Sequence, residues 1–240
     1  MLSRAEEDYL KAILELDEEH RAVTTSMLAA RMKVRPASVT GMVQKLARQR
    51  PGCVRYESHR GVSLTPTGRR IALEVIRHHR LIELYLAEAL GFEWDRVDAE
   101  AEVLEHVISE AFEDRIAALL GDPETDPHGD PIPRKDGSLA PTSRLLLTAV
   151  SAGEAVRVTR VRDDDPALLR YLTDRGIRLK TRLTVIDKAP FDGPLTCLVA
   201  SPTGQPAHDR TCALGRGAID SIFVERDEPT GEEVPEGEAP

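Results

Sequence analysis

The stretch "DAEAEVLEHVISEAF", residues 98–112, carries five acidic side chains and one histidine in a pattern typical of an amphipathic helix. Because a helix turns about 100° per residue, four of these side chains would share one edge beside an apolar stripe: Asp98, Glu102, Glu105 and His106. Carboxylates crowded beside a core disfavour one another's ionisation unless positive charge intervenes. The stretch therefore predicts a site for a divalent cation.

A second group of possible ligands precedes this stretch. The motif "HHRLIE" places His79 and Glu83 one helical turn apart. Such a pair alone is more often a surface ion pair, and a single histidine such as His106 is more often a hydrogen-bonded core residue, so the inference depends on two helices meeting. Carboxylates and imidazoles without thiolates suit Mn²⁺ or Fe²⁺ better than structural Zn²⁺.

The elements before these motifs follow the order of a winged helix-turn-helix. Ser3 and Glu6 form a capping box for a helix over about residues 3–18. Thr25 is the expected N-cap of a short second helix, and Pro36 suits the first position of a third. Residues 53–56 and 62–64 then predict a two-stranded wing.

The remainder of the chain predicts an α+β protein of several domains. Helices over about 66–90 and 95–120 would pack antiparallel or form a dimer interface. Residues 122–144 are rich in Pro, Gly and Asp and predict a linker, and short β-rich runs predict a small β-barrel. The expected divisions are a DNA-binding domain at 1–74, a helical metal-binding and dimerisation domain at 75–140, the barrel at 150–226 and a disordered acidic tail at 227–240.

Composition limits the possible functions. No apolar run approaches the roughly 20 residues of a membrane span, and the N-terminus is charged at once, so we expect a cytoplasmic protein without a membrane partner. The three cysteines, Cys53, Cys197 and Cys212, lie far apart in the sequence, which argues against a disulfide framework or a cysteine zinc site.

The net charge of −9 is unevenly distributed. Residues 31–80 contain 12 Lys or Arg against two acids, which leaves 20 basic and 39 acidic residues elsewhere. A basic segment that coincides with a helix-turn-helix and a wing favours DNA binding over an ordinary solvated surface. The expected contacts lie on the outward face of the third helix and on the wing: Pro36, Ala37, Ser38, Thr40, Gln44, Lys45, Arg48 and Arg60.

Six motifs in their order resemble the diphtheria toxin repressor family of metal-dependent transcription regulators over residues 1 to about 226: "EDYLKAI", "RPASVTGMVQKL", "RGVSLTPTGR", "HHRLIE", "EVLEHVIS" and "GDPIP". The resemblance implies a homodimer that binds operator double-stranded DNA when Mn²⁺ or Fe²⁺ lies between the DNA-binding and dimerisation domains. It also implies an SH3-like fold for the small β-barrel and repression of metal uptake genes.

Position by position, the resemblance assigns the primary metal ligands to Asp8, Glu102, Glu105 and His106, and the ancillary ligands to His79, Glu83 and Asp98. Asp8 and Glu102 stand where iron-responsive members carry methionine and cysteine, which favours the manganese-responsive type. Lys11 replaces an acid of the short manganese members and therefore argues against a bridged two-metal site. Asp165 matches a carboxylate that the SH3-like domain sometimes lends to the ancillary site.

Two alternatives stay open on the sequence alone. Carboxylates and histidines on facing helices also build di-metal oxidases, although those use Glu-x-x-His motifs on four helices, whereas Glu102 stands four residues before His106. A regulator that responds to iron rather than manganese is the second alternative. We expect a regulator and not an enzyme.

Overall fold

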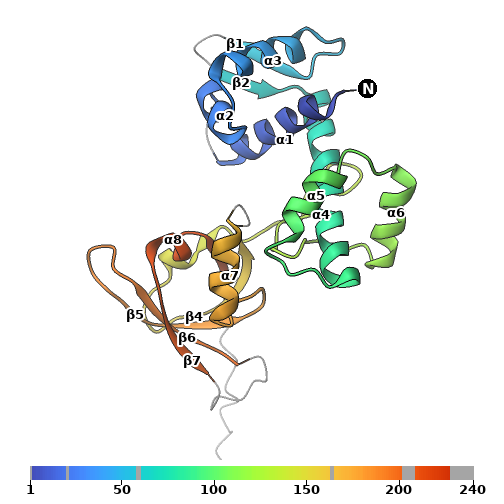
Figure 1. Cartoon of the computed structure of the whole chain (residues 1–240). Helices are drawn as coiled ribbons and strands as arrows, with labels where there is room; N and C mark the ends of the chain where they lie inside the picture. The colour runs from blue at the N-terminus through green and yellow to red at the C-terminus, as the bar shows by residue number, and fades with distance from the viewer. Residues whose placement is uncertain (1, 20–21, 58–60, 163–164, 202–208, 228–240) are drawn as a thin grey trace, which may run out of the picture. The chain divides into compact units, whose positions relative to one another are not determined.

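A computed structural model describes residues 2–19, 22–57, 61–162, 165–201 and 209–227 of the 240-residue chain. The chain forms two compact units, one comprising residues up to 126 together with 131–140, and the other comprising 127–130 together with residues from 141 onward. The first unit therefore holds both of the helical regions that the sequence predicts. The fold class is the predicted one, α+β with several domains (Figure 1).

The N-terminal region is a winged helix-turn-helix, as predicted. Three helices precede an antiparallel hairpin: α1 Arg4–Glu19, α2 Thr25–Arg31, α3 Pro36–Arg48, β1 Val54–Glu57 and β2 Gly61–Leu64. Thr25 is not the N-cap of α2, because the side chain of Thr24 accepts the hydrogen bond from the Met27 N–H. Two consecutive threonines made this one-residue error possible.

One core joins this region to the long helix α4, Pro66–Leu90. Leu10 and Ile13 of α1 are fully buried with Val39, Val43 and Leu46 of α3. The first half of α4 belongs to the same cluster of buried residues, while its second half packs in smaller clusters with the helices that follow. The helix α4 is therefore the common support of the first unit.

Both ends of α4 depend on glycine. A Cβ on Gly68 would lie 2.0 Å from the Cys53 carbonyl oxygen, so only glycine lets the first turn approach the chain next to β1. Gly91 has φ of 72°, a left-handed conformation in which glycine commonly ends a helix. The predicted bounds of 66–90 are confirmed.

The predicted single helix over about 95–120 is wrong. The chain forms α5, Val97–Leu104, then a turn, then α6, Glu110–Leu119. Ser109 begins α6 by accepting a hydrogen bond from the Phe112 N–H, and the Glu105 carbonyl lies against a His78 ring nitrogen at 3.1 Å. The expected apolar stripe fails beyond the break, because the side chain of Phe112 is exposed.

Part of the predicted linker packs against the first unit. Ile132 is buried beside α4 and α6, and the side chains of Arg77 and Arg80 donate to the carbonyls of Pro133 and Pro131. The Pro, Gly and Asp content predicted irregular backbone correctly. It gave no sign that two arginines of α4 would hold that backbone in place.

The second unit is the SH3-like sheet domain. Its six strands are all antiparallel in the order β3-β8-β4-β5-β6-β7, and register shifts interrupt the pairing at Val158/Arg160 and Val185/Asp187. The elements are β3 Leu145–Leu146, a 3-10 turn Leu147–Ala149, β4 Ala155–Val161, α7 Pro166–Asp174, β5 Arg182–Lys188, β6 Leu195–Val199, β7 Arg210–Leu214, α8 Arg216–Ile219 and β8 Ile222–Arg226. The predicted disordered tail falls, after Asp227, outside the described residues.

Cys197 and Cys212 are directly opposite each other on β6 and β7, with sulfur atoms 3.5 Å apart. Both are free thiols in this structure, and their separation in sequence gave no sign that they lie side by side. In the described part of the chain, no helix combines the length and apolar character that a membrane span needs.

Glu6 connects the start of α1 to the end of α3. The Ser3 N–H donates to its carboxylate at 2.8 Å, Gln49 donates at 2.6 Å, and the Lys45 ammonium lies 3.2 Å away. The bond from the Ser3 backbone, with smaller help from the Ser3 hydroxyl and Lys45, outweighs burial and holds the pKa of Glu6 below its usual value. The carboxylate therefore stabilises the fold in its ionised form.

We predict that Glu6→Gln lowers the free energy of unfolding by about 1 kcal/mol near neutral pH. A lowered folded pKa contributes stability above the unfolded pKa of about 4.3 that is lost as the pH falls through the folded value. Urea denaturation of both proteins should therefore show a difference near pH 7 that shrinks below about pH 4. Glu100→Gln, on an exposed acid of α5, is the control, and an equal loss at both pH values would contradict the assignment.

Candidate metal centre

The predicted ligands of the first unit come from three helices that meet. Helix α4 contacts both α1 and α5, and the candidates lie on these elements or in the turn after α5: Asp8 on α1, His79 and Glu83 on α4, Asp98 and Glu102 on α5, and Glu105 and His106 in the turn. The structure divides six of them into two neighbouring groups, and Glu102 lies beside the first.

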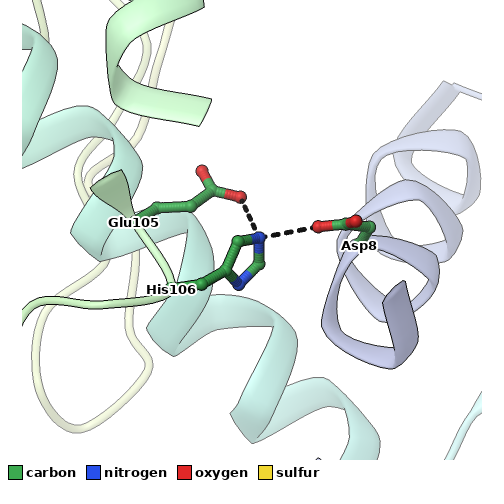
Figure 2. Close-up of side chains that lie close together, drawn as sticks. All are labelled: Asp8, Glu105 and His106. Atoms are coloured by element: carbon green, nitrogen blue, oxygen red, sulfur yellow. Dashed lines mark ion pairs between the residues drawn. The ribbon is translucent and has the colours of Figure 1, made fainter. Parts of the chain in front are cut away.

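Asp8, Glu105 and His106 form the first group (Figure 2). The His106 Nε2 atom lies 2.7 Å from Asp8 Oδ1 and 3.1 Å from Glu105 Oε1. Glu105 and the His106 side chain are buried, and Asp8 is half-buried. The helix break creates this geometry, because the turn after α5 points Glu105 and His106 toward α1 (Figure 2).

A cation fits the chemistry of this group. Glu7 Oε2 lies 2.7 Å from His106 Nδ1, so a proton on Nδ1 would leave the Nε2 lone pair facing two carboxylate oxygens. Among the described residues, Asp8 Oδ1, Glu105 Oε1 and His106 Nε2 are buried and make no hydrogen bond. Three ligand atoms converging without a hydrogen bond, with a carboxylate orienting the histidine from behind, are the arrangement of a metal site.

His79, Glu83 and Asp98 form the second group. His79 Nε2 lies 3.5 Å from Glu83 Oε1 and 3.4 Å from Asp98 Oδ1. Burial alone would lower the pKa of His79, but the charge of Glu83 and hydrogen bonds with Asp98 and Glu105 raise it well above its usual value. These residues match the predicted ancillary ligands.

Glu102 and Lys11 lie beside the first group. The Lys11 Nζ atom lies 2.9 Å from Glu102 Oε2, 2.8 Å from Glu105 Oε2 and 3.1 Å from His79 Nδ1. Burial would lower the pKa of Lys11, but the charges of Glu105 and Glu102 raise it above its usual value. Glu102 therefore contacts an ammonium ion in this structure.

The two carboxylates of the first group have different electrostatic surroundings. Burial raises the pKa of Asp8, and its carboxylate neighbours raise it further, against the opposing effect of His106. Burial would also raise the pKa of Glu105, but hydrogen bonds and charge from His79 and Lys11 lower it. The negative charge of Glu105 is therefore offset by His79 and Lys11, whereas that of Asp8 is offset less.

Sequence analysis missed two residues that position this group. Glu7 orients His106 and is adjacent to Asp8. An acid in the first turns of a helix carries no sign of this role in the sequence. His78 lies 3.1 Å from the Glu105 carbonyl and 3.2 Å from Glu113 Oε2, so it supports the turn that carries Glu105. The doubled histidine in "HHRLIE" was the available signal.

Asp165 belongs to the second unit. Its side chain accepts a hydrogen bond from the Ala167 N–H at 2.9 Å and begins α7 as N-cap. This is an established structural role for the carboxylate, and its predicted loan to the ancillary site stays a prediction.

The predicted DNA-contacting residues lie on one helix. Thr40 is half-buried and donates to the Pro36 carbonyl at 3.2 Å, and the other predicted residues of α3 are exposed: Pro36, Ala37, Ser38, Gln44, Lys45 and Arg48. Arg60 lies outside the described residues.

Comparison with known proteins identifies the family. Residues 1–62 match the N-terminal DNA binding domain of iron dependent repressors, residues 65–134 match their metal binding and dimerisation domain, and residues 145–226 match the FeoA domain. The chain belongs to the iron-dependent repressor family. It is accordingly a metal-dependent transcriptional repressor of this family, with a winged helix-turn-helix, a helical dimerisation domain and a C-terminal FeoA domain.

Its curated relatives include iron-dependent and toxin repressors. The iron-dependent repressor IdeR of Mycobacterium leprae is 35% identical over 75% of this chain and 82% of its own length. The diphtheria toxin repressor of Corynebacterium diphtheriae is 31% identical over 79% of this chain and 86% of its own length.

Solved structures extend the likeness to manganese regulators. A manganese-dependent transcriptional repressor in complex with manganese has a TM-score of 0.83 and 40% identity, covering 92% of this chain and 99% of its own. The regulator ScaR with bound Zn²⁺ has a TM-score of 0.74 and 31% identity over the same shares. Relatives named for iron and for manganese are therefore both present.

We predict graded losses of Mn²⁺ binding at the first group. His106→Ala removes a ligand candidate and should weaken binding by more than about 100-fold, whereas Glu7→Gln only releases the imidazole and should cost about 10- to 100-fold. Isothermal titration of metal-stripped protein measures both. The circular dichroism spectrum should be unchanged because His106 lies in a turn. Glu100→Ala, at an exposed residue of α5, is the control. Normal Mn²⁺ affinity in His106→Ala would mean that the metal does not bind at this group.

Proposed function

We propose that the protein is a homodimeric repressor that binds operator DNA when Asp8, Glu105 and His106 hold a divalent cation, with Mn²⁺ preferred and Fe²⁺ as the alternative. The observation that carries this proposal is the 2.7 Å approach of Asp8, on the first helix of the DNA-binding domain, to His106, on the turn of the dimerisation helices. It would act in the cytoplasm, where operator DNA lies.

The switch follows from the elements that carry the ligands. When no metal ion is bound, the carboxylates of Asp8 and Glu105 both face one imidazole. Their repulsion favours separation of α1 from the turn. A bound divalent ion would supply positive charge and ligand bonds that join them. Because α1 packs in one core with α3, fixing α1 fixes the recognition helix of each protomer relative to its dimer partner. A coupling of about 1–3 kcal/mol would change operator affinity about 5- to 150-fold.

The ligand chemistry supports Mn²⁺. The first group offers two carboxylates and one imidazole, and this set of hard oxygen and nitrogen donors suits Mn²⁺ and Fe²⁺. Asp8 and Glu102 stand where the iron-responsive pattern carries sulfur. The manganese-bound repressor with 40% identity agrees with this preference, while the iron-dependent relatives keep Fe²⁺ as the alternative.

The second group would assist. His79, Glu83 and Asp98 are an ancillary site in this proposal. Glu102 would lie at the edge of the first group, where its charge acts on Asp8. The burial of His79 and Glu83 supports a role that an ordinary surface ion pair would not need.

Exposed apolar side chains support the dimer. Several lie on α5, α6 and the turn between them: Val103, Leu104, Val107, Phe112 and Leu119, which are 37–74% exposed. A cluster of this kind on a soluble chain marks an interaction surface, and a self-complementary patch produces a two-fold dimer. The dimer would then place two copies of α3 at two operator half-sites.

The oxidase alternative has less support. Its ligand candidates would have to come from paired motifs on four helices, whereas Asp8, Glu105 and His106 come from one helix and one turn. The relatives are named as repressors. Oxygen consumption by the Fe²⁺-loaded protein would favour the oxidase.

We predict that Arg48→Ala weakens binding to all DNA alike and reduces the slope of log affinity against log salt by about one. Ser38→Ala should instead change the ranking of operator variants, because an exposed serine near the helix N-terminus can read base edges. Fluorescence anisotropy over a salt series measures both. Arg170→Ala, at an exposed residue of α7, is the control. An unchanged salt slope for Arg48→Ala would mean that Arg48 does not contact a phosphate.

The metal response tests the proposal as a whole. Metal-stripped protein titrated with Mn²⁺, anaerobic Fe²⁺, Co²⁺ or Zn²⁺ should gain operator affinity most readily with Mn²⁺. Asp8→Met exchanges a hard ligand for a soft one and should weaken activation by Mn²⁺ more than activation by Fe²⁺ or Co²⁺. If Asp8 only stabilises the first turn of α1, the loss would be about 0.3–1 kcal/mol of stability with every metal. No response to any metal would refute the proposed switch.

A further inference from the structure

Two of the three cysteines lie opposite each other on neighbouring strands of the second unit. Cys197 on β6 pairs with Cys212 on β7 (Figure 1), and their sulfur atoms are 3.5 Å apart. Directly opposite residues of an antiparallel pair have Cα atoms about 4.5 or 5.5 Å apart, and both spacings fall within the range of about 4.4–6.8 Å that a disulfide spans. The backbone therefore already suits a bond between these two thiols.

The two thiols differ in their access to solvent. Cys197 is fully buried, whereas Cys212 is half-buried. Strand β7 is also the last in the order of the described strands of this sheet, so it has a neighbouring strand on one side alone. A small reagent in solution would therefore reach the sulfur of Cys212 before that of Cys197.

The surroundings of the pair favour the thiolate of Cys212. The hydrogen bond with Cys197 and the positive charge of Arg175 lower the pKa of Cys212 against the effect of burial, while the same bond and burial raise the pKa of Cys197. Arg175 ends α7 and stacks on the Tyr171 ring, and the Tyr171 hydroxyl donates to the carbonyl of Ala213, next to Cys212. Since the thiolate is the reactive form of cysteine, Cys212 is the more reactive of the two.

The third cysteine has none of these features. Cys53 is buried in the core of the first unit, and burial raises the pKa of its thiol. A buried thiol in apolar surroundings reacts slowly. Cys53 therefore serves as an internal reference for the reactivity of the pair.

We propose that Cys212 and Cys197 form a redox modification site, at which a peroxide converts the two thiols to a reversible disulfide between β6 and β7. The Cys212 thiolate attacks one oxygen of hydrogen peroxide, the O–O bond breaks, and hydroxide leaves, which makes Cys212 a sulfenic acid. Cys197 then loses its proton and attacks that sulfur, so that the S–S bond forms and the S–O bond breaks with release of water. In total the two thiols lose two electrons, and the peroxide is reduced to two waters.

The site is independent of the proposed metal switch. Both cysteines and Arg175 belong to the second unit, and none of them is a candidate metal ligand. The thiols are free in this structure, which agrees with a transient disulfide of the redox-sensing kind and not with a permanent structural bond. The proposal therefore gives the FeoA domain a response to oxidant that does not rest on the proposed function.

The test uses the full-length protein without metal, so that peroxide does not react with a bound ion. The folded protein is treated with a small molar excess of hydrogen peroxide, then denatured in an alkylating reagent without reductant and analysed by mass spectrometry. Alkylation should fall from three cysteines to Cys53 alone, with the peptides of Cys197 and Cys212 joined, and dithiothreitol should restore all three. Cys53→Ala is the control and should form the same disulfide.

Single substitutions test the order of the two steps. Cys197→Ser should react at Cys212 and stop at the sulfenic acid, which dimedone traps, whereas Cys212→Ser should keep Cys197 reduced. Arg175→Gln should slow the loss of thiols several-fold near pH 7 and move the pH midpoint of the rate upward, because the thiolate loses a nearby positive charge. Arg170→Gln, at an exposed residue of the same helix, should change neither.

Three results would overturn the proposal. They are the absence of joined peptides in the folded unmodified protein, disulfides that join two chains instead of two strands, and a sulfenic acid on Cys197 in Cys212→Ser. If a cysteine variant fails to fold, the joined peptides of the unmodified protein decide on their own.

Discussion

The structure of the first unit depends on positive charge that offsets buried carboxylates at one junction of helices. Asp8, Glu102 and Glu105 approach one another where α1, α4 and α5 meet, and buried carboxylates are costly unless they are paired. Lys11 and His79 compensate one side of Glu105, whereas the other side faces a histidine nitrogen and Asp8. Positive side chains thus face one oxygen of Glu105, whereas the other oxygen faces ligand candidates, and in the proposed function a divalent cation would bind on that second side.

Helix α4 allows this junction to couple two domains. Its first half is part of the helix-turn-helix core and its second half packs against α5 and α6. The turn that carries Glu105 and His106 is held to α4 by His78, and α6 is held by the ion pair of Arg77 with Glu113. One half of the site is thus fixed to the dimerisation helices, and the other half, Asp8, belongs to the body that contacts DNA.

Local signals predicted most of the fold, and they failed where tertiary contacts decide. Capping residues and apolar periodicity gave α1 and α4 with bounds close to those observed and α3 with its first residue. The same periodicity continued across residues 105–109, because Ile108 and Phe112 keep the helical spacing. The break is accompanied by the cap that Ser109 gives α6 and by the contact of His78 with the Glu105 carbonyl. Residue types and spacing suggested Glu105 and His106 of the first group, whereas Asp8 came only from the family resemblance. Nothing local could show that Lys11 reaches His79, 68 residues away, or that Glu7 orients His106.

The two carboxylates of the first group differ in a way that suits a switch. Lys11 and His79 lower the pKa of Glu105 against the effect of burial and so favour its ionised form. Burial raises the pKa of Asp8, which has only His106 opposing this effect. In the proposed switch, a cation between the two carboxylates would offset charge at Asp8, the carboxylate with less positive charge around it. Because Asp8 is carried by α1, which shares a core with α3, a cation bound as proposed would act on the residue whose position is tied to that of the recognition helix, while Glu105 would hold it on the dimerisation side.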